Sequence, residues 1–242
     1  MLKGYTKQEI SWMMYDWANS AHSVIIVTLL PIFFDTVAGY TADSVSSMST
    51  WGYATSIAML IVALAAPFLG VFGDIRGMRK KLFSFFMLLG VAACAGMAFT
   101  PGMDFTSGPV AAGKVASLIL VLYIVSVIGF DASAIYYDAF LTDVTTEDRM
   151  DKVSTMGYGL GYIGGSTIPL LIFLIMNLVG VPMLTCLAFV FGLTAVWWLA
   201  FSLPLLKNCE QTSGKPYEKG DVARSMKGVG TTVKEIIANK PM

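Results

Sequence analysis

Six long apolar runs, separated by short polar connections, account for most of the chain. They cover about residues 15–35, 50–72, 82–100, 114–137, 154–177 and 182–204. An α-helix needs about 20 apolar residues to cross the hydrocarbon core of a bilayer, and each run is close to that length. The pattern therefore predicts an all-α membrane protein in which residues 1–206 form a bundle of six transmembrane helices.

The chain turns polar after Pro204 and stays polar to Met242. We expect residues 207–242 to form a cytoplasmic linker, in which "NCEQTSGKPYEKG" is typical of a mobile segment. Arg224, Lys227 and Lys234 then lie off one apolar helical face. The residues of that face are Val222, Met226, Val229, Val233, Ile236 and Ile237. They predict a short basic amphipathic helix that lies on the membrane surface or against the bundle.

Lysine and arginine residues are distributed unevenly between the connections. Fifteen of the sixteen lie before the first run or after the second, fourth or sixth, and only Lys114 lies in the alternate connections. The positive-inside rule places the cation-rich side in the cytoplasm. Both termini are therefore predicted to be cytoplasmic, as an even number of spans requires.

Composition supports lipid as the solvent. Only 13% of the residues are charged, about half of the ~25% that is usual in soluble domains. The net charge of zero gives no reason to expect a nucleic-acid partner. Cys94, Cys186 and Cys209 are far apart, so we expect buried apolar residues and no metal site. The N-terminus lacks the pattern of a signal peptide, and the first run is predicted to be a retained helix.

The stretch "GVFGDIRGMRKK", residues 70–81, gathers four cations and an aspartate into one glycine-broken turn. A topological anchor in a tight turn explains the cations, but it requires neither the aspartate nor a defined order. The stretch resembles the signature loop between helices two and three of the major facilitator superfamily, although Ile75 stands where many members carry a basic residue. The residues that we interpret as a conformational latch motif are Gly70, Asp74, Arg76, Gly77, Arg79 and Lys80.

Two further stretches are similar to the vacuole-effluxer-like branch of that superfamily. They are "YDWANSAHSVIIVTLLPIFF" at 15–34 and "YYDAFLTDVTTEDRMDKVSTMGYGLGYIGG" at 136–165. The resemblance implies a secondary transporter of twelve helices in two halves, which moves a small solute by alternating access. This chain would supply the N-terminal six-helix half and the central linker. We expect either a truncated chain that lacks its second half or a half-size protein that pairs with a second copy.

Polar side chains inside the spans are the candidates for a solute pathway, because an ionisable group in a bilayer is costly unless it faces a cavity or a partner. Asp16, Asn19, Ser20 and Ser23 follow i, i+3, i+4, i+7 spacing and share one stripe of the first span. For Asn19 and the two serines, cavity lining and hydrogen bonding between helices are equal alternatives. Asp16, near the cytoplasmic end, is interpreted as structural.

His22 and Asp131 lie at similar depth in the antiparallel first and fourth spans, about 10 Å from the cytoplasmic edge by helix rise. The resemblance implies that these two spans line the cavity. We therefore expect His22 and Asp131 to face the pathway, and we hypothesise that they interact and carry a coupled proton. A histidine that serves only packing is the alternative.

A loop charge network is predicted from Asp138, Asp143 and Arg149. Asp138 or Asp143 is expected to reach Arg76 or Arg79 and to tie two cytoplasmic loops together. Exposed ion pairs contribute little, so such a latch depends on partial burial.

Gly157, Gly161 and Gly165 form a Gly-x-x-x-Gly-x-x-x-Gly row in the fifth span. Such a row lets another helix approach closely, and packing is the favoured interpretation. A flexible hinge is the alternative.

The sequence contains no nucleophile elbow, Walker loop, metal-spaced His/Cys set or dinucleotide fingerprint, so we expect neither enzyme activity nor a cofactor. The leading hypothesis is a permease in a bacterial cell (inner) membrane, with the lipid bilayer, a small-molecule substrate and a coupled proton as partners. The eukaryotic members of the branch are associated with amino-acid efflux, which makes amino acids candidate substrates. The spans hold essentially no cation, which disfavours strongly anionic substrates. A six-span membrane scaffold or receptor without transport activity is the alternative.

Overall fold

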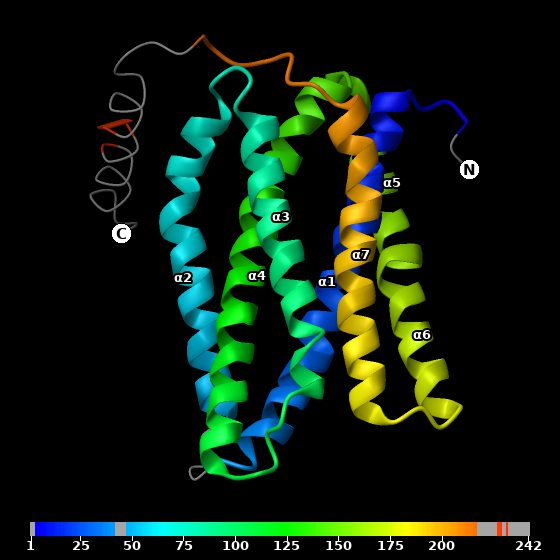
Figure 1. The fold of residues 1–242 in the computed structure, drawn as a ribbon. Coiled ribbons are helices and arrows are strands. Elements are labelled where there is room, and N and C mark those ends of the chain that lie inside the picture. Colours follow the sequence, from blue (N-terminus) through cyan, green and yellow to red (C-terminus); the bar gives the residue numbers. More distant parts are fainter. Residues whose placement is uncertain (1–2, 42–46, 217–226, 229–230, 232–242) are drawn as a thin grey trace, which may run out of the picture.

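The computed structural model describes residues 3–41, 47–216, 227–228 and 231, and long helices that run side by side dominate it (Figure 1). Six of its helices are long and apolar enough to cross a membrane, which confirms the six predicted spans and the all-α class. The predicted amphipathic helix of the tail falls almost wholly outside the described residues.

The helices follow the predicted runs closely. The first four spans are α1 (Lys7–Ala38), α2 (Ser47–Gly73), α3 (Arg79–Met97), which is followed by a 3-10 turn (Thr100–Gly102), and α4 (Pro109–Val144). The fifth span is composite: a 3-10 turn (Glu147–Arg149), α5 (Met150–Leu160), a π-helix (Gly161–Ser166) and α6 (Thr167–Leu178). The sixth span is α7 (Met183–Asn208). Several helices extend beyond their apolar runs into the neighbouring polar residues.

The start of α1 illustrates this extension. The Thr6 hydroxyl accepts a hydrogen bond from the Glu9 backbone N–H at 3.1 Å, and the Glu9 carboxylate accepts one from the Thr6 N–H at 2.7 Å. This reciprocal capping box satisfies two of the free N–H groups at a helix start. The helix therefore begins eight residues before the apolar run, at Lys7.

Close helix packing depends on small residues where α3 meets α4. A Cβ atom built on Gly129 of α4 would lie 2.5 Å from the backbone nitrogen of Gly90 in α3. The two helices can approach this closely only because both positions lack a side chain. Trp198 of α7, which is fully buried, packs against the same place, 2.4 Å from where a Cβ of Gly90 would lie.

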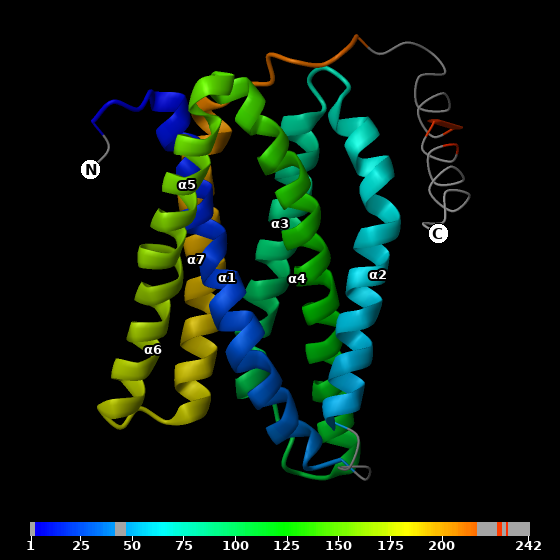
Figure 2. The same cartoon turned by 180° about the vertical axis from the view of Figure 1, so that it is seen from behind.

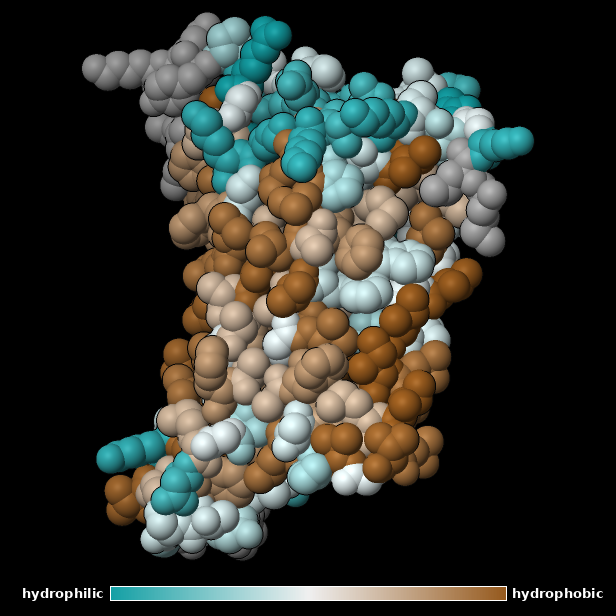
Figure 3. Space-filling view, turned by 45° about the vertical axis from the view of Figure 1, so that its right-hand side comes forward, coloured by the Kyte–Doolittle hydropathy of each residue, from teal (hydrophilic) through white to brown (hydrophobic). Residues whose placement is uncertain are grey.

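The face of the molecule seen in Figure 3 is largely apolar between two polar ends. Large apolar side chains are exposed on several helices, including Leu64 of α2 at 64%, Val121 of α4 at 57% and Val196 of α7 at 65%. Water would solvate such a continuous apolar surface poorly, whereas lipid solvates it well.

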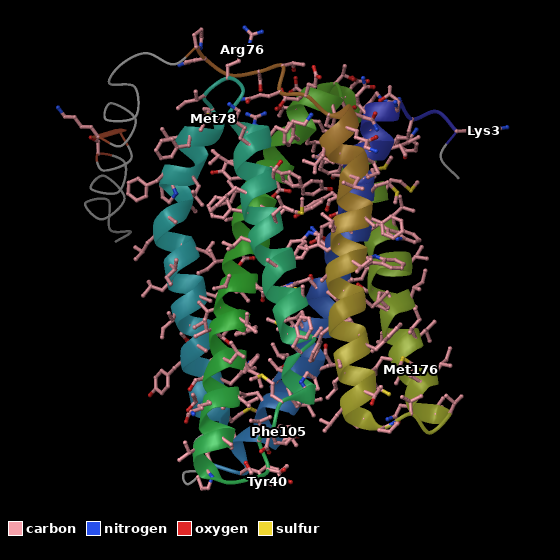
Figure 4. The ribbon with its side chains drawn as sticks, in the orientation of Figure 1. Lys3, Tyr40, Arg76, Met78, Phe105 and Met176 are labelled. Atoms are coloured by element: carbon pink, nitrogen blue, oxygen red, sulfur yellow. The ribbon has the colours of Figure 1, made fainter. Side chains whose placement is uncertain are left out.

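The two polar ends of the bundle are formed by different connections. The start of α1, the α2–α3 loop, the α4–α5 connection and the end of α7 lie together at one end, where Lys3 and Arg76 are found (Figures 1 and 4). Tyr40 and Phe105 mark the opposite end, with their ring centroids 5.6 Å apart. The cation-rich connections therefore share one end, and its assignment to the cytoplasm remains a prediction.

We expect single cysteines at the two ends to react with a membrane-impermeant maleimide from opposite sides of the membrane. Ser107→Cys should react in intact cells, and Thr146→Cys should react only after permeabilisation. Both positions are exposed. The background should be low because the three native cysteines are buried, and burial raises the pKa of the Cys209 thiol to about 12. Reaction of Thr146→Cys alone in intact cells would reverse the predicted orientation.

Candidate functional site

A cavity of about 560 Å3 opens on one flank of the bundle. Its lining comes from α1, α4 and the fifth span, which lie in front of α3 and α7 in the view of Figure 2. The lining runs from Asp16 and Asp138, near the latch-motif end, to Ser23 and Ser166, near the middle of α1. The cavity therefore extends towards the middle of the membrane-spanning region.

The polar stripe of α1 lines this cavity. Asp16, Asn19, Ser20 and Ser23 all face it, as the i, i+3, i+4, i+7 spacing allows. The structural interpretation of Asp16 is incomplete: Asp16 belongs to the cavity lining, and Thr6 caps the helix instead. One Asp16 carboxylate oxygen, Oδ2, accepts a hydrogen bond from the Tyr137 hydroxyl at 2.9 Å.

His22 and Asp131 do not line the cavity, and no hydrogen bond joins them among the described residues. His22 is buried, its Nε2 lies 3.3 Å from the Ser126 hydroxyl, and its ring stacks on Phe130 with centroids 4.7 Å apart. Asp131 keeps one buried carboxylate oxygen without a hydrogen-bond partner. Both residues lie in helices that contact each other, α1 and α4, but helical rise does not specify the direction of a side chain. Phe130 of α4 and Trp198 of α7 pack against the His22 ring.

The seam between α1 and α4 is held by buried polar contacts. The Trp12 indole N–H donates to the Tyr137 carbonyl at 2.9 Å, and the two rings stack at 4.3 Å between centroids. The hydroxyls of Tyr15 and Ser133 lie 2.8 Å apart. Each of these contacts joins a residue of α1 to a residue of α4. The contacts therefore fix the register of the two helices that contribute most to the cavity.

At the end of the bundle that holds the latch motif, Arg79 is the centre of the contacts. Its guanidinium donates to the Asp143 carboxylate and, at 3.0 Å, to the Ala139 carbonyl of α4. Asp74 lies farther away, with 3.9 Å between its Oδ1 and Arg79 Nη2, and its side chain is 82% exposed. The structure thus brings together Arg79 and Asp143, a pairing anticipated for the loop charge network, and buries both side chains.

The other latch-motif residues have different surroundings. Gly77 has φ +79°, a conformation that favours glycine and reverses the chain before α3. Gly70 has open space around it, in the last turns of α2, so no close approach requires a glycine there. Arg76 is exposed, and Lys80 lies in the first turn of α3.

A segment after α7 lies across this motif, and we call residues 209–216 the strap. The Gln211 side chain accepts from the Gly77 N–H at 2.8 Å and donates to the Gly73 carbonyl at 3.0 Å. The Asp143 carboxylate accepts from the backbone N–H groups of Thr212 and Ser213 at 3.0 and 2.8 Å. The beginning of the predicted mobile linker is thus bound to the motif loop.

A short parallel β-bridge extends the contact between strap and loop. The Arg76 N–H donates to the Lys215 carbonyl and the Lys215 N–H to the Asp74 carbonyl, both at 3.0 Å.

The sequence gives only a weak signal for the strap. Its Gln, Thr and Ser side chains form hydrogen bonds with backbone groups readily in any turn, so they do not indicate which loop the strap will contact.

Arg149 does not join Asp138 or Asp143, contrary to the predicted loop charge network. Its guanidinium forms two hydrogen bonds to the Glu9 carboxylate, at 2.8 and 2.9 Å. The Thr145 hydroxyl donates to the same carboxylate at 2.6 Å. Glu9, which the sequence reasoning missed, therefore ties the α4–α5 connection to the start of α1. Asp138 instead lines the cavity.

The glycine row of the fifth span packs against α1. A Cβ on Gly157 would lie 2.6 Å from Asp16 Oδ2, one on Gly161 2.6 Å from the Ser20 hydroxyl, and one on Gly165 2.4 Å from the Trp17 carbonyl oxygen. Close contact agrees with the packing interpretation. The last two glycines also fall within the π-helix, a local widening of the helix that the sequence pattern did not reveal.

Comparisons with known proteins agree with this architecture. A family model described as "Vacuole effluxer Atg22 like" matches residues 5–241. An uncharacterized MFS-type transporter of Bacillus subtilis (strain 168), YxiO, is 39% identical over 244 aligned positions. The alignment covers 98% of this chain and 54% of the relative, so the chain spans about half the length of that protein.

We expect Gly165→Ala to destabilise the protein by about 1–3 kcal/mol, because the new methyl group would meet the rigid Trp17 carbonyl. The measurement is thermal unfolding of the purified protein in detergent. Gly159→Ala is the matched control: a Cβ there meets nothing within 4 Å. Equal stability of the two variants would contradict the close packing of α1 against the π-helix.

We expect Gln211→Ala to speed hydrogen exchange at the Gly77 and Arg79 amides by about five- to tenfold. Both N–H groups donate to the side-chain amide oxygen of Gln211, Oε1, and a hydrogen bond of this kind contributes about 1 kcal/mol to stability. Mass spectrometry of peptides from the motif loop provides the measurement. Glu210→Ala, at the exposed neighbouring position, should leave the exchange unchanged. Unchanged exchange in Gln211→Ala would show that the strap does not protect the loop.

Proposed function

Because the chain belongs to the Atg22-like vacuole effluxer family and is an integral membrane protein, we propose that it forms one six-helix half of a secondary transporter. In this proposal the protein moves a small solute across the bilayer by alternating access. Amino acids are the first candidate solutes, through the resemblance to the effluxer branch. The cell membrane of a bacterium is the proposed location, supported by the bacterial relative.

The observation that carries the proposal is the flank cavity. Transporters built from repeated halves bind their solute near the bilayer midplane, at the interface between the halves. Here the lining comes from only three spans on one flank and reaches towards the middle of α1. A second six-helix unit facing that flank would close the cavity, and we propose either a further half of the protein or a second copy of the chain in that place.

The contacts at the latch-motif end support a conformational role. Arg79 and Asp143 are buried partners from α3 and α4, and the strap covers them. Breaking a buried ion pair is costly unless another arrangement replaces it. We propose that this assembly stabilises one of the two states of the transporter and rearranges when the halves rock.

A coupled proton is the third part of the proposal. Asp131 has a buried carboxylate oxygen that lacks a hydrogen-bond partner, and an acid of this kind in a span is a candidate proton carrier. His22 is not required for it, since the two side chains do not bond to each other.

The test is uptake by the full-length protein, with any second six-helix half included, in proteoliposomes, with a panel of amino acids and small peptides, with and without an inward proton gradient. We expect at least one solute to accumulate faster with the gradient. Asp131→Asn should remove this gradient dependence while the protein remains folded. Ser107→Ala, at an exposed loop position remote from the cavity, is the control.

The result that would overturn transport is equally direct. Folded, reconstituted protein that shows neither uptake nor exchange of any solute in the panel would favour the six-span scaffold. Uptake whose pH profile is the same in Asp131→Asn and the natural protein would leave transport in place and remove the proton assignment.

A further inference from the structure

The flank cavity has a chemistry that is specific enough to identify part of its solute. Resting on the proposed transport function, we infer that the cavity binds the ammonium group of an amine-bearing solute between Asp16 and Asp138, with the apolar body of the solute against aromatic rings. The carboxylate of an amino acid is not required for recognition by this half. Family membership suggests amino acids as solutes, but it assigns the ammonium group to no residue and leaves open whether the carboxylate is needed.

The charge balance of the cavity is the first argument. Asp16 and Asp138 both line it, and within the part of the chain that the structure describes its lining includes no lysine, arginine or histidine. Two carboxylates that share a cavity repel each other, and the low-dielectric surroundings strengthen the repulsion. A cation that enters the cavity relieves it, whereas an anion adds to it.

The free hydrogen-bonding capacity of the two acids is the second argument. Asp16 is 9% exposed, and Oδ2 accepts the Tyr137 hydroxyl at 2.9 Å. A carboxylate can accept about four hydrogen bonds, so Asp16 retains capacity towards the cavity. Asp138 is exposed to the cavity, and no hydrogen bond or ion pair of its side chain occurs among the described residues. An ammonium group has three donors and matches such a pair of acceptors.

The aromatic walls are the third argument. Five rings line the cavity: Trp12, Phe130, Tyr137, Tyr158 and Tyr162. Tyr158 and Tyr162 are each 65% exposed, with ring centroids 5.7 Å apart, so part of each ring is accessible to a solute. Ring faces attract cations and also cover apolar surface. The combination of two carboxylates and several rings is therefore suited to an amine with an apolar or aromatic body.

A metal ion is a poorer occupant of the same acids. Hard cations such as Ca2+ take six to eight oxygen ligands, whereas the cavity offers two carboxylates. Within the described parts of the chain, no group of three or more His, Cys, Asp or Glu side chains could hold a metal ion.

The test compares three solutes that share a phenyl ring and differ in charge. Phenethylamine carries the ammonium group alone, phenylalanine carries both charges, and 3-phenylpropionate carries the carboxylate alone. Titration calorimetry on the intact, detergent-purified protein should show binding of the first two and at least tenfold weaker binding of the third. Asp16→Asn and Asp138→Asn should each weaken phenethylamine binding by about tenfold or more, as expected for a lost charged hydrogen bond.

Asp35→Asn is the matched control, because it removes the same charge from the exposed far end of α1. The affinity of the Asp35→Asn variant for phenethylamine should equal that of the natural protein. Asp138→Asn also guards against misfolding as an explanation, since the Asp138 side chain is exposed and makes no described hydrogen bond.

The other outcomes distinguish the ammonium site from the transport function. Tight binding of 3-phenylpropionate, binding of none of the three solutes, or unchanged phenethylamine affinity in both cavity variants would overturn the ammonium site. Solute uptake in the proteoliposome assay would still establish transport in those cases. Conversely, ammonium-selective binding without any uptake would retain the site and overturn the transporter.

Discussion

The structure depends on one constraint: a lipid interior cannot solvate polar groups, so each polar side chain within a span must find a partner or a cavity. The seam between α1 and α4 shows the first solution, in the contacts of Trp12 with Tyr137 and of Tyr15 with Ser133. The flank cavity shows the second, since the stripe that begins at Asp16 opens into it. Fold and candidate site are therefore two outcomes of the same requirement.

Much of this arrangement could be predicted from the sequence, because strong signals are local. Run length and hydropathy identified six spans, and the i, i+3, i+4, i+7 spacing identified the α1 stripe that faces the cavity. The latch motif and the two similar stretches indicated the family that the whole-chain comparison shows. Glycine spacing in the fifth span pointed to close packing, and α1 is the helix that it approaches. In each case the information lies within one helix or one loop.

Features that depend on the direction of side chains between distant segments could not be predicted. Gln211 and Gly77 are 134 residues apart, and nothing in a Gln-Thr-Ser stretch indicates which loop it will contact. Glu9 and Arg149 form a pair over 140 residues, although the sequence allowed Arg149 other acidic neighbours. His22 and Asp131 were expected at similar depth and to interact, but helical rise determines depth only. The rotation of each helix about its axis decides whether two side chains meet, and packing with α7 aromatics influences it here.

The π-helix at Gly161–Ser166 has a geometric consequence for the fifth span. A π turn accommodates about one residue more than an α turn. The residues of α6, which follows it, are therefore rotated by about 100° about the helix axis relative to a continuous α-helix. The face that α6 presents is thus rotated from the one that an uninterrupted α-helix would present, although α5 and α6 belong to one span. Gly161 and Gly165 lie within this turn, where a Cβ would meet Ser20 and the Trp17 carbonyl, so the offset occurs at the close contact with α1.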